Sequence, residues 1–102
     1  MKAVRVQYTV KPGYVEQNKK NIEAVMNAIR ANPINGMLYA TYQMPDAVSF
    51  MHLNVAVDGE TMDKLNAVEE FKIFRNELKA SEPVVPPKAE DLGFVGSSAE
   101  LF

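Results

Sequence analysis

Hydrophobic and polar residues alternate along the first segment of the chain, residues 4–10, VRVQYTV. Valine and Tyr8 fall on one parity, whereas arginine, glutamine and threonine fall on the other. Strict alternation of this kind is typical of a strand with one buried face. Residues 37–44 are rich in β-branched and aromatic side chains and predict a second strand, and residues 48–57 predict a third. Because only a short turn at Pro45-Asp46 separates these two strands, we expect them to form a hairpin.

The period changes to three or four residues in two longer segments, 14–31 and 60–79, which predict amphipathic helices. In the first segment the apolar stripe consists of Ile22, Val25, Met26 and Ile29. In the second it consists of Met62, Leu65, Val68, Phe71, Phe74 and Leu78. Glu69-Glu70 is a candidate break between two shorter helices. Asn32-Pro33 ends the first helix, since the residue before a proline disfavours the helical conformation.

The last third of the chain predicts a connector followed by a strand. Residues 81–91, SEPVVPPKAED, contain three prolines, which favours an extended, polyproline-like surface segment. Residues 92–98, LGFVGSS, predict a short final strand. The order strand, helix, strand, strand, helix, strand is the ferredoxin-like βαββαβ arrangement, an α+β fold. We therefore expect a single domain over residues 1–102, with both helices on one face of a four-stranded antiparallel sheet.

The uncovered face of such a sheet must meet water or a partner. One parity of the third predicted strand is wholly apolar (Met51, Leu53, Val55, Val57), and the other is mixed (Phe50, His52, Asn54, Ala56). If the apolar parity lies on the open face, it forms an exposed patch of the kind that marks an interface. A homodimer through the open sheet face is then the economical arrangement. In the alternative arrangement, the apolar parity packs against the helices and the other face of the strand is exposed to solvent.

Composition excludes several classes of function. The chain has a formal net charge of −2 and no basic run, which argues against nucleic acid as a partner. Its apolar stretches are too short to span a membrane. The chain has no cysteine and a single histidine, His52, so we expect no disulfide, no thiolate nucleophile and no zinc site. A cytoplasmic location is the default expectation.

Three segments resemble the antibiotic biosynthesis monooxygenase-like proteins. They are VQYTVKPG at residues 6–13, the Gly-led second strand beginning Gly36-Met37-Leu38-Tyr39, and EEFKIFRNEL at residues 69–78. The resemblance implies a dimeric α+β barrel, in which two ferredoxin-like protomers pack sheet to sheet. Members of that family include cofactor-free oxygenases of quinols or polyketide-like phenols, haem-degrading enzymes and many proteins with no known activity.

The functional residues of the family carry over only in part. A Glu and a Trp that are frequent on the third strand fall on Asn54 and Ala56, and two frequent histidines of the second helix fall on Leu65 and Glu70. The chain has no tryptophan, which argues against haem degradation. The resemblance does imply that the parity of His52 and Asn54 points toward the helices, where the pocket of the family lies.

His52 is the candidate catalytic base, because its ordinary pKa near 6.5 suits the removal of a phenol or quinol proton. The alternative is a half-buried histidine that only hydrogen-bonds its neighbours. The candidate substrate-binding residues are Asn54, Tyr8, Tyr42 and Phe71. Each also has a purely structural interpretation, since buried tyrosines need a hydrogen-bond partner and phenylalanine at helical spacing usually belongs to the core.

The leading hypothesis is a cofactor-independent monooxygenase-like protein that acts on a small phenolic or quinol substrate. The deprotonated substrate would itself reduce O2, so no cofactor is expected. One alternative is a non-catalytic or stress-related dimeric barrel protein that binds a small apolar or aromatic ligand, or none. An isomerase- or lyase-type enzyme on the same barrel is a third hypothesis.

Overall fold

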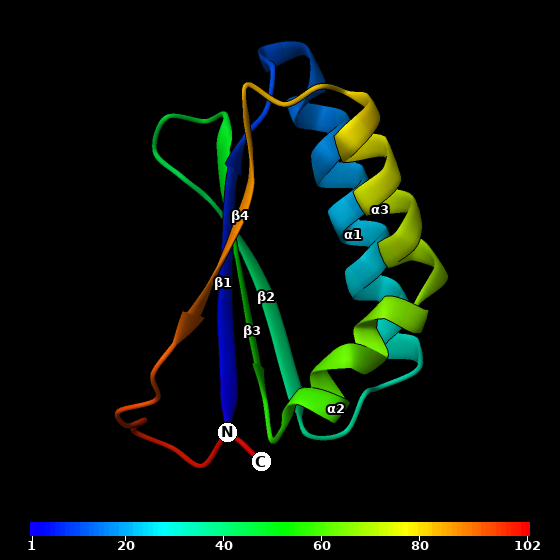
Figure 1. The fold of residues 1–102 in the computed structure, drawn as a ribbon. Coiled ribbons are helices and arrows are strands. Elements are labelled where there is room, and N and C mark those ends of the chain that lie inside the picture. Colours follow the sequence, from blue (N-terminus) through cyan, green and yellow to red (C-terminus); the bar gives the residue numbers. More distant parts are fainter.

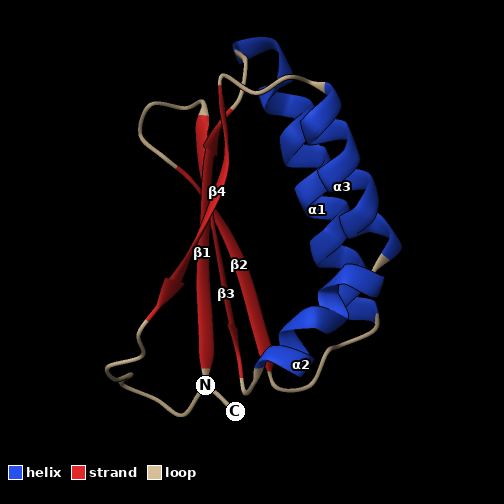
Figure 2. Cartoon of the chain, in the orientation of Figure 1, coloured by secondary structure: helices blue, strands red, loops and turns tan.

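The computed structural model describes all 102 residues. A single four-stranded sheet lies against a layer of helices (Figures 1 and 2). The strands are β1 (Lys2–Thr9), β2 (Met37–Gln43), β3 (Ser49–Ala56) and β4 (Val85–Leu92). The helices are α1 (Val15–Ala31), α2 (Gly59–Asp63) and α3 (Glu69–Ala80), with short 3-10 turns at Pro12–Tyr14 and Lys64–Ala67. The sheet order is β2-β3-β1-β4 and all pairings are antiparallel. The predicted ferredoxin-like α+β fold is confirmed.

The second helical segment is broken rather than continuous. Helix α2 begins after Asp58, whose side chain accepts a hydrogen bond from the backbone N–H of Thr61 at 2.7 Å and so caps the helix. Helix α3 begins after Val68, which has an extended backbone. The acidic Glu69 and Glu70 occupy the first turn of α3, where carboxylates interact favourably with the helix dipole. The predicted break therefore lies just before this acidic pair.

The prediction for the last strand is wrong. Strand β4 runs from Val85 to Leu92 and includes Pro86 and Pro87, which we assigned to a connector. Prolines cannot donate to a sheet and are confined to edges and bulges. Both conditions hold here, because β4 is an edge strand and its pairing with β1 shifts register between Gln7 and Thr9, opposite the two prolines. Residues 93–98, assigned to the strand from sequence, form no strand.

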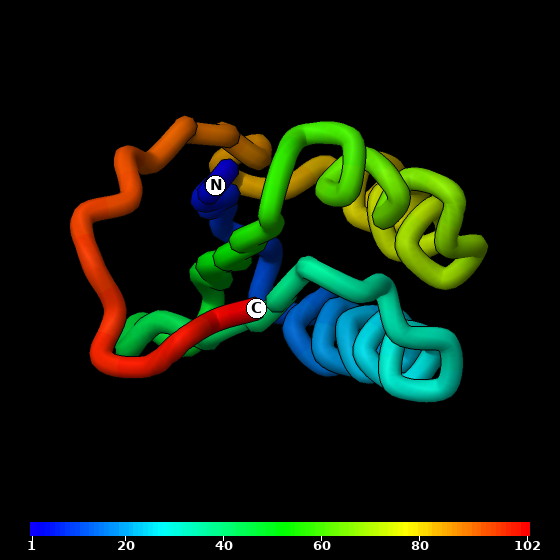
Figure 3. Tube along the Cα trace, turned by 90° about the horizontal axis from the view of Figure 1, so that it is seen from below, coloured from blue at the N-terminus to red at the C-terminus, as the bar shows by residue number.

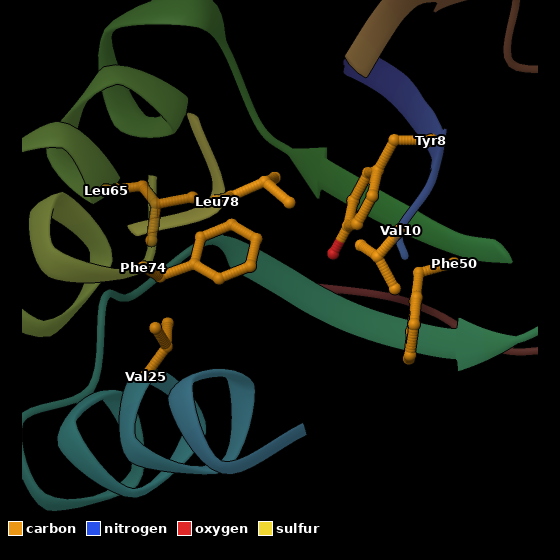
Figure 4. Packing of buried hydrophobic residues seen from close by; sticks show 7 residues of the cluster. All are labelled: Tyr8, Val10, Val25, Phe50, Leu65, Phe74 and Leu78. Carbon is orange, nitrogen blue, oxygen red and sulfur yellow. The ribbon is translucent and has the colours of Figure 1, made fainter. Parts of the chain in front are cut away.

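The core lies between the sheet and the helices (Figure 4). Tyr8 and Phe50 stack there with their ring centroids 5.8 Å apart, and Phe74 of α3 packs against Tyr8. Val25 reaches this cluster from α1. Burial of large aromatic and aliphatic side chains in one cluster supplies most of the favourable free energy of such a fold. The predicted inward parity of the first strand is confirmed by Tyr8 and Val10, which are both fully buried.

No helix covers the opposite face of the sheet (Figure 1), which is largely apolar at β2 and β3. Leu38 and Tyr42 are 50% and 55% exposed, and Met51 and Leu53 are half-buried. On the same face Arg5 forms an ion pair of 2.6 Å with Glu90 across β1 and β4. The residues after β4 loop round this side of the sheet, and the chain ends close to its N-terminus (Figures 1 and 3). None of the helices combines the length and apolar character that a membrane span requires.

Candidate functional site

A cavity of about 660 Å³ opens between the helix-facing side of the sheet and helix α3. Its volume lies within the range of about 300–1,000 Å³ that is usual for ligand sites. Aliphatic and aromatic side chains form most of the wall, including Val4, Val6, Leu65, Phe71, Phe74 and Leu78. The polar groups of the inner wall come from the strands and are Tyr8, Tyr39, His52 and Asn54. An apolar cavity with a few convergent polar groups is the usual form of a small-molecule site.

His52 lies on this wall with both ring nitrogens hydrogen-bonded. Its Nε2 is 2.8 Å from the hydroxyl of Tyr8, and its Nδ1 is 2.6 Å from the hydroxyl of Tyr39 and 3.0 Å from that of Thr41. The antiparallel register produces this arrangement, because Thr41 lies directly opposite His52 on β2 and Val6 lies opposite it on β1. Tyr39 and Tyr8 are then the diagonal neighbours, which long side chains can reach.

Burial makes His52 a neutral residue over the physiological range. The side chain is 4% exposed, and loss of hydration lowers its pKa from 6.5 to about 4. The same cause, burial, raises the pKa of the Tyr8 and Tyr39 hydroxyls well above their usual value. The network therefore consists of a neutral imidazole and two neutral phenols, so a proton can move along it only when a ligand supplies or removes charge.

Asn18, on helix α1, fixes the direction of one hydrogen bond in this network. It is fully buried, and its Nδ2 donates to the Tyr8 oxygen at 2.9 Å. The Tyr8 hydroxyl can thus donate its own proton to His52 Nε2, while Nδ1–H of His52 donates to Tyr39 or Thr41. In that tautomer the Tyr8 oxygen keeps a second lone pair, which can accept a hydrogen bond from a ligand in the cavity.

Asn54 is the other polar residue of the wall, two residues along β3 from His52 and on the same face. It is 8% exposed, and its side-chain amide makes no hydrogen bond within the protein. A buried polar atom without a partner costs about 1–3 kcal/mol. Because Asn54 lines the cavity, its Nδ2 can donate a hydrogen bond to a ligand hydroxyl or carbonyl.

The structure brings together four of the five site residues predicted from sequence. His52, Asn54, Tyr8 and Phe71 all line the cavity, and Phe71 lies edge-on to Tyr39, with their centroids 6.1 Å apart. Tyr42 does not line the cavity. It pairs across the hairpin with Met51, and therefore lies on the open face of the sheet.

Tyr39 and Asn18 are the members of the network that the sequence analysis missed. Tyr39 and Tyr42 have opposite parities on one strand, so only one of them can face the helices, and the hairpin register selects Tyr39. A signal for Asn18 was present in the sequence. It extends the stripe of Ile22, Val25 and Ile29 by one helical turn, which places a polar residue at a buried position.

No group of three or more histidine, cysteine or carboxylate side chains lies close enough together to hold a metal ion. The polar groups of the inner wall are thus one imidazole, two phenols and an amide. Such groups can hydrogen-bond an oxygen substituent of an aromatic ring and can move a single proton.

Solved structures share this architecture over almost the whole chain. A predicted antibiotic biosynthesis monooxygenase from Nitrosomonas europaea is similar over 94% of this chain and 100% of its own, with a TM-score of 0.81 at 16% identity. The chain has the fold of the antibiotic biosynthesis monooxygenases. SnoaB from Streptomyces nogalater, a cofactor-independent oxygenase, has the same fold, with 97% of each chain covered, a TM-score of 0.71 and 14% identity. A protein of unknown function from N. europaea also has this fold, with 99% of this chain and 95% of its own covered, a TM-score of 0.78 and 14% identity.

No family model matches the sequence, and no curated protein is similar enough to match it. The structural likeness confirms the ferredoxin-like fold of the protomer that the short sequence resemblances implied. At identities of 14–16% it says nothing about which residues act in this chain. Any function must therefore be argued from the cavity itself.

Proposed function

We propose that this protein is a cofactor-independent monooxygenase that acts on a small phenol or quinol bound in the cavity. The observation that carries the proposal is the contact of 2.8 Å between the Tyr8 hydroxyl and His52 Nε2 on an otherwise apolar wall. The unpartnered amide of Asn54 beside them supports it. The likeness in fold to SnoaB, a cofactor-independent oxygenase, makes this reaction class the natural one to test.

In the proposed reaction the substrate hydroxyl donates to the free lone pair of the Tyr8 oxygen, and Asn54 binds a second oxygen of the substrate. The substrate proton passes to Tyr8 while the Tyr8 proton passes to His52 Nε2. Asn18 holds the Tyr8 oxygen in place during this exchange through its hydrogen bond of 2.9 Å. Tyr8 therefore has a larger role than orientation alone, because it lies between the substrate and the base.

The deprotonated ring then reduces O2 and forms a carbon–oxygen bond at an open ring position. The O–O bond then breaks and the ring carbon loses its hydrogen as a proton. One oxygen atom remains on that carbon as a carbonyl, and the other leaves as water with this proton and the one held by His52. A phenol with an open para position and one O2 give a quinone and one water, so atoms and electrons balance without an external reductant. The proton on His52 returns to the leaving oxygen, which regenerates the neutral imidazole.

The lowered pKa of His52 limits which substrates can react. Transfer of a proton from a phenol of pKa about 10 to a base of pKa about 4 is unfavourable by about 8 kcal/mol, at ~1.4 kcal/mol per pH unit. A phenolate beside the imidazolium reduces this cost, since an opposite charge at close range raises the pKa of histidine. More acidic phenols, such as those fused to further rings or carrying electron-withdrawing groups, are therefore the better substrates.

The test is oxygen consumption with a panel of hydroxylated naphthalenes and anthrones. We expect uptake with the wild-type protein and a loss of about 100-fold or more in the Tyr8→Phe variant, the usual size of a lost proton-transfer group. Tyr42→Phe is the matched control, because Tyr42 lies on the opposite face of the sheet, and should retain full activity. No uptake with any member of the panel, or equal activity in Tyr8→Phe and the wild type, contradicts the proposal.

A binding protein without catalysis is the second candidate. It is favoured by the fact that both ring nitrogens of His52 already have partners within the protein. Here a ligand of the panel should raise the melting temperature, because binding to the native state stabilises it, while O2 uptake stays at the background rate. Turnover that depends on Tyr8 would exclude this candidate.

We further propose that a second copy of the chain covers the open sheet face. The exposed Leu38 and Tyr42, together with Met51 and Leu53, form a patch of the kind that marks an interface. Leu38→Glu should convert the dimer to a monomer in sedimentation equilibrium at micromolar concentration. Ile73→Glu is the control, since Ile73 is similarly exposed at 44% but lies on helix α3. A monomeric wild-type protein refutes this proposal and leaves the chemistry of the cavity untouched.

A further inference from the structure

The mouth of the cavity has a different chemical character from its interior. Arg75 and Lys79 of helix α3 line it, four residues apart and hence on the same side of the helix. The inner wall carries no charged group at neutral pH, because His52 is neutral. A ligand in this cavity thus meets neutral polar groups at one end and cations at the other.

Neither cation is paired with a carboxylate. The four ion pairs of the protein join Lys2 to Asp91, Arg5 to Glu90, Lys19 to Glu16 and Lys72 to Glu69. Glu82 also lines the mouth, but it forms no ion pair with Arg75 or Lys79. The local excess is therefore one positive charge, although the whole chain has a net charge of −2.

The guanidinium of Arg75 is held at the mouth by two contacts. It lies over the ring of Phe71 at 4.9 Å from the centroid, and its Nη1 lies 3.4 Å from Asn66 Oδ1. A cation–π contact with an aromatic residue of the cavity wall restrains the side chain before any ligand arrives. Its remaining N–H groups have no acceptor within the protein and can donate to a planar anion.

We propose that the ligand of this cavity is an aromatic hydroxy acid, whose ring occupies the apolar interior and whose carboxylate is bound at the mouth by Arg75 and Lys79. The inference rests on the proposed function, because it assigns a substrate class to the same cavity. The hydroxyl and the carboxylate of such a ligand lie at opposite ends of the ring system, because the hydroxyl meets Tyr8 on the inner wall while the carboxylate meets the two cations at the mouth.

The experiment compares two fluorescent probes, 5-hydroxy-1-naphthoate and 1-naphthol, which differ only in the carboxylate that the first carries on the ring opposite the hydroxyl. Dissociation constants are measured by probe fluorescence with the wild-type protein and with Arg75→Gln, Lys79→Gln and Lys72→Gln. Two ion pairs at a partly exposed mouth, each worth about 0.5–1 kcal/mol, correspond to roughly 5- to 30-fold tighter binding of the naphthoate. Each substitution at Arg75 or Lys79 should reduce that ratio, and binding of 1-naphthol should not change.

Lys72→Gln is the matched control, because Lys72 is on the same helix but pairs with Glu69 and does not line the cavity. The ratio of the two dissociation constants should be the same in this variant as in the wild type. In both proteins it should decrease when salt is raised from about 20 mM to about 0.5 M, since ions screen exposed charges. Equal binding of the two probes, or an equal loss in Lys72→Gln, refutes the anion site while binding of 1-naphthol still supports the cavity. If neither probe binds, both the anion site and the proposed function fail.

Discussion

Acid should destabilise this protein in part through His52, and the size of the effect follows from its burial. The folded protein lowers the pKa of His52 from 6.5 to about 4, because the charged imidazolium is poorly hydrated inside the core. Between these two values the unfolded chain binds a proton that the folded chain does not. The contribution of His52 to the free energy of unfolding therefore has its full value above pH 6.5 and decreases as the pH drops toward 4. The total loss is about 3 kcal/mol, at ~1.4 kcal/mol per pH unit.

The measurement is urea denaturation of the wild-type protein and of His52→Gln at several pH values between 4 and 7.5. Glutamine retains a donor and an acceptor but does not titrate. Carboxylates with lowered pKa values, among them Asp46 and Asp58, destabilise both proteins alike at low pH. The difference between the two proteins therefore isolates His52. As the pH falls from 7 to 4, the free energy of unfolding of the wild type should decrease by about 3 kcal/mol more than that of the variant.

Parallel stability curves for the two proteins would refute the reasoning. A second measurement does not depend on the variant folding. His52 is the only histidine, so its ring protons give unambiguous NMR signals in the intact protein. A midpoint near 6.5 in their titration would show that the imidazole is hydrated, and the neutral hydrogen-bond network would then be wrong.

Three further predictions concern single positions. Asn54→Leu should leave the free energy of unfolding unchanged or raise it by about 1 kcal/mol in urea denaturation, because the buried amide has no partner to lose. The same variant should bind 1-naphthol more weakly, as measured by probe fluorescence. Gly36→Ala should lower the melting temperature, because Gly36 has φ 80° and an added Cβ would lie 3.0 Å from a methyl group of Val57. We expect calorimetry to show a decrease of about 1–3 kcal/mol in the free energy of unfolding. If His52 is the base, kcat/KM should decline on the acid side with a midpoint near 4, and a midpoint at 6.5 would contradict the lowered pKa of His52.

The sequence was informative where a single period decided the outcome. Alternation in residues 4–10 correctly placed Tyr8 on the helix-facing side. The parity of the third strand left two orientations open, and the family resemblance pointed to the correct one, with His52 and Asn54 toward the helices. Pairing across strands was harder to predict. Whether Tyr39 or Tyr42 faces the cavity depends on the hairpin register, because a shift by one residue exchanges the two faces of a strand.

The error at the last strand has a different cause. Pro86 and Pro87 argue against a strand on local grounds, and LGFVGSS is the more apolar candidate. Tertiary structure reverses this preference, because the exposed edge of β1 accepts pairing from a strand whose prolines fall at an irregularity. Sequence patterns also cannot show whether the space between sheet and helices is filled by side chains or left open as a cavity.

The fold does not require the polar residues of the cavity wall. A leucine at Asn18 would continue the apolar stripe of α1, and an aliphatic residue at Asn54 would suit the helix-facing side of β3 as Ala56 does. Instead both amide oxygens are buried without a partner, at a cost of about 1–3 kcal/mol each. Such local costs are expected where a site must hold polar groups ready for a ligand. Asn18 positions the Tyr8 hydroxyl through its hydrogen bond of 2.9 Å and Asn54 lines the cavity itself, so both residues serve the polar wall rather than the stability of the chain.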